Sequence, residues 1–130
     1  MNKQEHIAYW IAITEKDQQV MILLYKNREF VYSLFFAHLI LEKYCKALWV
    51  KNNVGNVPPK THNILKLLEE SKVEVDNDTK KFIARLSVYQ LEGRYPQFKN
   101  ALYNTTSQEK TDYFMNEFEK FKLWLTKFLQ

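Results

Sequence analysis

The sequence has few of the residues that build turns, disulfides or metal sites. Its 130 residues include two Gly, three Pro and one Cys. Strand-rich folds need frequent turns, so this composition favours long helices. One cysteine excludes an intramolecular disulfide and a cysteine-based zinc site, and it fits a reducing compartment. The histidines lack HxxxH or HExxH spacing and the glycines are isolated, so we expect neither a metal nor a bound cofactor.

Long apolar runs and clustered charges are also missing. A membrane-spanning helix takes about 20 apolar residues, whereas the longest runs here are IAYWIAI and VMILLY. The N-terminal sequence MNKQEHIAYW has no basic segment followed by an apolar block. The net charge of +4 comes from scattered lysines, a pattern typical of a solvated surface. We therefore expect a cytoplasmic protein that does not enter a membrane.

Apolar and aromatic residues are abundant, at 46% and 15% of the chain, which argues against disorder. The length suits one domain, residues 1–130. Apolar residues recur at helical spacing in four long segments and two shorter ones. The expected helices cover residues 3–25, 29–51, 62–71, 78–92, 98–103 and 106 to nearly the end of the chain. We predict an all-α fold, an antiparallel bundle of four or five helices with up-and-down topology.

Turn and capping residues mark the expected ends of these helices. Thr61 should cap the short helix, and Thr106 with Glu109 should form a capping box for the last one. Gly93 should end the fourth segment in a left-handed conformation. The RYP sequence at 94–96 should be a turn, because proline cannot continue a helix.

The second predicted helix is the most apolar, yet it contains a row of ionisable residues. His38, Glu42 and Lys46 recur every four positions, and a Glu that precedes a Lys is the favourable order for an ion pair. Asp17 is equally out of place on the apolar face of the first helix. Because an unpaired buried carboxylate is costly, both acids need partners. The candidate partners are His38, Lys46, His62 and Arg94. These groups either tie helices together or form a site, and the pattern alone leaves both interpretations open.

The last predicted helix has an aromatic stripe at helical spacing. Its residues are Phe114, Phe118, Phe121, Leu125 and Phe128. A stripe with this period is typical of a helix face that packs in a core. We therefore interpret it as core rather than as a platform on which bases stack.

Four motifs, in this order along the chain, resemble the HEPN domain family (higher eukaryotes and prokaryotes nucleotide-binding domain). AHLILEKYCKALW, residues 37–49, resembles the signature second helix of the family. Trp10 and Asp17 match its first-helix pattern. The sequence PKTH, residues 59–62, with the leucines that follow resembles the family's loop and short helix. RYP resembles the turn of one branch. The similarity covers residues from about Trp10 to Pro96.

The resemblance implies a helical bundle that commonly dimerises, in a prokaryotic setting and often beside a minimal nucleotidyltransferase (MNT). Many family members are RNases or toxins that use an Arg followed, after four to six residues, by a His. The His acts on the ribose hydroxyl or the leaving group, and the Arg stabilises phosphate charge. Here neither Arg85 nor Arg94 is followed by a His, and His62 is the last histidine of the chain. The usual RNase pair is therefore missing.

We expect a HEPN-domain binding or accessory protein rather than an enzyme. It would be associated with a nucleotide or RNA, would form a homodimer, and would have an MNT nucleotidyltransferase as a further partner. The expected site residues are Asp17, His38, Glu42, Lys46, His62, Arg94 and Tyr95. One alternative is an RNase toxin of a toxin–antitoxin pair with a displaced catalytic set, in which His38 or His62 is the base and Arg94 stabilises phosphate. Another is a purely structural dimerisation module.

Overall fold

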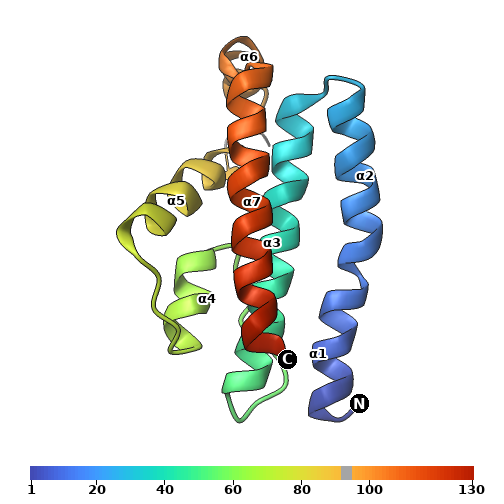
Figure 1. Ribbon diagram of the computed structural model, residues 1–130, viewed down its shortest axis with the longest axis vertical. Helices are drawn as coiled ribbons and strands as arrows, with labels where there is room; N and C mark the ends of the chain where they lie inside the picture. The colour runs from blue at the N-terminus through green and yellow to red at the C-terminus, as the bar shows by residue number, and fades with distance from the viewer. Residues whose placement is uncertain (92–94) are drawn as a thin grey trace.

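The computed structural model describes residues 1–91 and 95–130, and these residues form helices and no strand (Figure 1). The helices are α1 (Lys3–Ala12), α2 (Thr14–Lys26), α3 (Phe30–Asn52), α4 (Ile64–Glu70), α5 (Asn77–Leu91), α6 (Pro96–Thr105) and α7 (Gln108–Leu129). The predicted all-α bundle is confirmed.

The long helix α3 is the centre of the bundle and contacts each of the other six helices. Figure 1 shows α1 and α2 stacked end to end along one side of α3, with α7 running beside α3. Side chains of α3 such as Leu34, Leu41 and Leu48 are fully buried. This burial explains why α3 is apolar on nearly all sides, since neighbouring helices cover most of its surface.

The aromatic stripe of α7 packs into the same core. Phe114, Phe118 and Phe121 are buried, and so is Leu125. Phe128, which we also assigned to the stripe, is 38% exposed. It lies in the last turn of α7, where its ring contacts Trp124 at a centroid distance of 4.7 Å.

The first predicted helix is interrupted at Ile13, so residues 3–25 form two helices rather than one. The buried Thr14 is the local cause. Its hydroxyl donates to the Ile11 carbonyl at 2.7 Å and accepts from Gln18 Nε2 at 3.2 Å. A threonine hydroxyl that bonds to the preceding turn competes with the helical backbone pattern, and such competition often bends a helix.

Two predicted helix caps are wrong by one or two residues. Asn63, not Thr61, caps α4 by accepting from the Lys66 N–H at 3.0 Å. Ser107, not Thr106, caps α7 by accepting from the Lys110 N–H at 3.1 Å. Ser, Thr and Asn cap equally well in sequence terms, and only the backbone angles decide among neighbours.

Thr106 instead belongs to the core. It is buried, and its hydroxyl is hydrogen-bonded to the hydroxyl of Tyr89 at 2.9 Å. Without Thr106 at the cap position, the expected box with Glu109 does not form. Thr106 thus ties the start of α7 to the inner face of α5, and both hydroxyl groups gain a partner away from water.

The connection from α5 to α6 contains the RYP sequence. The predicted stop at Gly93 lies outside the described residues, as does Arg94. Tyr95 is extended, as expected before a proline, and α6 begins at Pro96. The short helix predicted over 98–103 therefore starts earlier and spans ten residues. Proline is well tolerated at the first position of a helix, where no N–H is needed for an intrahelical bond.

Candidate functional site

The carboxylate of Glu42 lies in the interior of the bundle, and each of its oxygens has a basic side chain as its partner. Glu42 is only 2% exposed. His62 Nδ1 lies 2.9 Å from Oε1, and Lys46 Nζ donates to Oε2 at 3.3 Å. Hydrogen bonds to an ionised group are stronger than neutral ones, and they offset the cost of burying the charge. Both partners are among those that the sequence predicted for the buried acids.

A second histidine extends this arrangement from α3 to α5. His38 has no exposed surface, and its Nδ1 lies 3.9 Å from Glu42 Oε1. Its Nε2 lies 3.2 Å from Ser87 Oγ, while the Ser87 hydroxyl donates to the Ile83 carbonyl at 2.7 Å. Ser87 has one proton to donate, so it accepts from His38 Nε2–H. We call His38, Glu42, Lys46 and His62 the Glu42 cluster.

His62 is the member of the Glu42 cluster that faces solvent. Its side chain is 54% exposed, although Nδ1 is held by the buried carboxylate. The carboxylate can only accept, so Nδ1 carries a proton and Nε2 is the nitrogen available to a ligand. A carboxylate that fixes the orientation of an imidazole is the arrangement used for general acid–base work and for anion contacts.

Lys46 forms the other edge of the cluster. Its side chain is mostly buried, and Nζ lies 5.4 Å from the ring centroid of Trp10. The lysine therefore joins α3 to α1 through a cation–π contact as well as through Glu42. The cluster has one carboxylate and at least one permanent positive charge. A single carboxylate that is already paired with an ammonium is a poor ligand set for a metal ion.

Asp17 is paired with a residue that the sequence prediction missed. Lys43 Nζ lies 2.5 Å from Asp17 Oδ2, and both side chains are mostly buried. Of the candidates that the sequence named, Lys46 and His62 pair with Glu42 instead, and Arg94 lies outside the described residues. Lys43 directly follows Glu42 in the signature helix and lies about one turn before Lys46. This position in the apolar helix could have indicated that Lys43 also needs an acidic partner.

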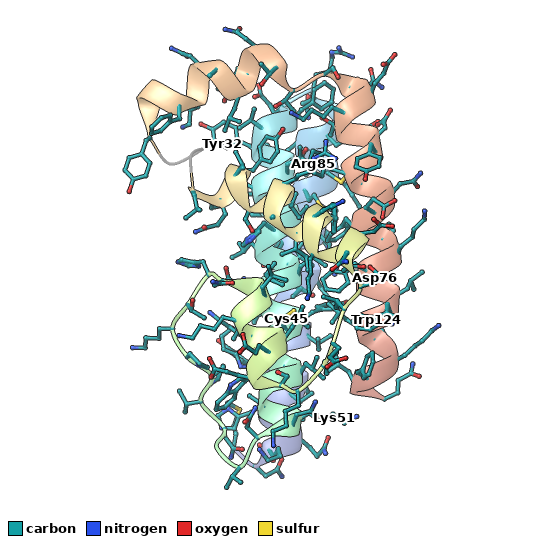
Figure 2. All side chains as sticks on the ribbon, turned by 90° about the vertical axis from the view of Figure 1, so that its left-hand side faces the viewer. Tyr32, Cys45, Lys51, Asp76, Arg85 and Trp124 are labelled. Atoms are coloured by element: carbon teal, nitrogen blue, oxygen red, sulfur yellow. The ribbon has the colours of Figure 1, made fainter. Side chains whose placement is uncertain are left out.

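Tyr95 lies away from the Glu42 cluster. It precedes α6, and its exposed ring contacts Phe98 edge-on at a centroid distance of 6.4 Å. Helix α6 packs beside Tyr32, near the start of α3, whereas Cys45 lies much farther along the helix (Figure 2). Glu42 follows Tyr32 by ten residues, a rise of about 15 Å along a helix. The structure thus brings His38, Glu42, Lys46 and His62 together and places Tyr95 at another end of the bundle.

The structure also bears on three further features: the single cysteine, metal binding and membrane spans. Burial first, and then the charge of Glu42, raises the pKa of the Cys45 thiol, so this cysteine is no nucleophile. Within residues 1–91 and 95–130, no group of three or more His, Cys, Asp or Glu side chains is placed to hold a metal ion. Among the same residues, no helix has both the length and the apolar character needed to cross a membrane.

The all-helical fold agrees with the family that the sequence matches. The family model of the HEPN domain matches residues 7–128. No curated protein and no solved structure matches the chain. The family match includes the signature helix that contributes His38, Glu42 and Lys46, and it extends through α7. The chain therefore belongs to the HEPN domain family.

Proposed function

We propose that this chain is a HEPN-domain binding or accessory protein for a nucleotide or RNA, and that the Glu42 cluster holds the phosphate groups of its ligand. The observation that carries the proposal is the half-exposed His62, whose orientation is fixed by a buried carboxylate 2.9 Å away. The missing Arg-to-His pair supports binding rather than RNA cleavage.

The cluster offers two different contacts to an anion. His62 Nε2 faces solvent, where it donates a hydrogen bond to a phosphate oxygen when the ring is protonated. The Lys46 ammonium beside it is a point charge that strengthens such a contact. Arg94, outside the described residues, is the third basic group that the sequence assigns to the site. Asp17 is already paired with Lys43, and Lys46 pairs with Glu42.

Titration of ATP and of short single-stranded RNAs against the protein tests this proposal. We expect His62→Gln, Lys46→Ala and Arg94→Ala each to weaken binding about tenfold, which corresponds to about 1.4 kcal/mol for one lost phosphate contact. Lys127→Ala, at the far end of α7, is the matched control and should bind as the parent does. Absence of binding, or binding that none of the three substitutions changes, would contradict the ligand proposal.

The geometry of His62 also supports a second candidate, an RNase toxin with a displaced catalytic set. A histidine oriented by a carboxylate is suited to remove a proton from a ribose hydroxyl. Under the binding proposal, purified protein leaves cellular RNA and tRNA intact, and its expression does not arrest growth. Cleavage that disappears in His62→Gln and persists in Lys127→Ala would instead establish the RNase.

A homodimer is part of the proposal, and we place its interface at an apolar furrow between α2 and α7. The furrow has a volume of about 480 Å³. Ile22, at its edge, is half exposed. The other lining residues are Met21, Tyr25, Lys26, Asp112, Met115, Asn116 and Glu119. Exposed apolar furrows commonly mark protein contacts.

On the family resemblance, an MNT nucleotidyltransferase is the further partner. The identity of the adjacent gene tests this directly.

Ile22→Glu should convert the dimer to monomer. A charge placed in an apolar interface must be desolvated without a partner, at a cost of several kcal/mol. Mass measured by light scattering during gel filtration gives the oligomeric state. Leu91→Glu is the control and should remain dimeric, because Leu91 is an exposed leucine on α5, away from the furrow. A parent protein that is monomeric at all concentrations, or a dimer unaffected by Ile22→Glu, would contradict this interface.

A further inference from the structure

Tyr32, Lys99 and Tyr103 form a second cluster, at the end of the bundle where α3 begins and α6 packs beside it (Figure 2). Lys99 Nζ donates to the Tyr32 hydroxyl oxygen at 2.8 Å and lies 4.9 Å from the centre of the same ring. The rings of Tyr32 and Tyr103 meet edge-on with their centroids 6.2 Å apart. Both tyrosines are accessible, since Tyr32 is 37% and Tyr103 41% exposed.

The two hydroxyl groups differ in acidity because they share one hydrogen bond. The ammonium of Lys99 and then the hydrogen bond with Tyr103 lower the pKa of Tyr32. Partial burial and the same hydrogen bond raise the pKa of Tyr103 to about 12. A hydrogen bond that Tyr103 donates to the Tyr32 oxygen explains both directions, because it stabilises the ionised form of Tyr32 and the neutral form of Tyr103. The carboxylate of Glu29 opposes ionisation of both tyrosines, but its contribution to each is the smallest.

The Lys99 ammonium therefore donates to one exposed phenolic oxygen, and the ring of Tyr103 packs against the same tyrosine. A phenolate is a far better nucleophile than a phenol, and an adjacent positive charge is a common way to activate a nucleophile. Lysine and tyrosine come from different helices, so packing of α6 on α3 fixes their approach. Most surface tyrosines have no such support for the ionised form.

We propose that Tyr32 is a nucleophilic tyrosine and a site of covalent modification by group transfer to its oxygen. The phenolate attacks an electrophilic phosphorus, sulfur or carbonyl carbon that carries a leaving group. A bond from oxygen to that atom forms, the bond to the leaving group breaks with its electron pair, and the phenolic proton passes to solvent. Lys99 and Tyr103 hold the negative charge on oxygen before the attack. The site lies about 15 Å along α3 from Glu42 and does not depend on ligand binding there.

An aryl sulfonyl fluoride tests the nucleophile directly, because the phenolate displaces fluoride and leaves a stable sulfonate ester. Peptide mass spectrometry after brief labelling near neutral pH measures the rate at each tyrosine of the intact chain. Tyr9 and Tyr113 are internal controls, since they are more exposed (50% and 46%) and, within the described residues, neither hydroxyl accepts from a lysine. Arg85 lies 5.5 Å from the centre of the Tyr113 ring, so Tyr9 is the stricter of the two controls. We expect Tyr32 to react several-fold faster than either, because a lowered pKa raises the fraction of phenolate near neutral pH.

Substitutions separate activation from mere exposure. Lys99→Met should bring the rate at Tyr32 down to that of Tyr9, and Tyr103→Phe should lower it by less. Lys127→Met is the matched control and should change nothing. Circular dichroism checks that each variant is folded, and titration of phenolate absorbance should lose its most acidic component in Tyr32→Phe. A rate at Tyr32 no higher than at Tyr9 and Tyr113, or one that survives Lys99→Met, overturns the proposal.

Discussion

Replacing Glu42 with Gln should lower the free energy of unfolding by about 2–4 kcal/mol. The substitution keeps the size of the side chain but removes the charge that Lys46 and His62 face from either side. Lys46 would then be a mostly buried ammonium without its counter-ion, and losing one partner of a buried pair is strongly destabilising. Because His62 is half exposed, it contributes less than a fully buried partner would. Urea unfolding gives the change in midpoint, and an unchanged m value would show that the loss is one of stability.

The matched control is Glu117→Gln on α7, because Glu117 pairs only with the exposed Lys120. Pairs of this kind contribute little, so the expected loss is below about 0.5 kcal/mol. If Glu42→Gln proved as mild as Glu117→Gln, the cluster would not be a stabilising centre. Ligand titration of folded Glu42→Gln also separates two readings. Weaker ligand binding supports the proposed site, whereas loss of stability or dimer affinity alone fits a purely structural module.

The sequence predicted the elements and pairings that depend on position along one helix. Glu42 and Lys46 are four residues apart on α3, so their ion pair follows from helical geometry alone. The central place of α3 follows from its apolar character on nearly all sides. His62 was also named as a candidate partner, but its contact with Glu42 depends on how the segment before α4 packs on α3. The first two inferences need no knowledge of which helices touch.

Two missed pairings depend on how separate helices approach one another. Asp17 and Lys43 are 26 positions apart, and a helical wheel shows the face of each residue but not the neighbour that meets it. Tyr32 and Lys99, 67 positions apart, meet only because α6 packs across the start of α3. Capping residues failed for a different reason. Adjacent Ser, Thr and Asn residues have similar capping ability, and the backbone angles that choose among them are set by tertiary packing.

Phe118→Ala should destabilise the protein by about 3–5 kcal/mol. Phe118 has no exposed surface and lies in the core beside the other buried aromatic residues of α7. Removing its ring would lose the apolar burial and leave a cavity that close-packed neighbours cannot fill. Thermal or urea unfolding measures the loss. The result bears on function, since a ring at the centre of a core cannot stack on a base of the ligand.

Phe128→Ala provides the comparison, because Phe128 belongs to the same sequence stripe but remains 38% exposed. Its ring contacts Trp124 near the end of α7, so we expect a loss of about 1 kcal/mol or less. A large difference between the two substitutions would show that helical spacing places both rings on one face of α7, but that the core covers only part of this face. Phe118 lies inside the covered part and Phe128 beyond it. Equal effects would mean that the last turn of α7 is buried in solution, as it would be if a partner covered it. RNA affinity that fell in Phe118→Ala under conditions where the variant is folded would contradict the assignment of this stripe to the core.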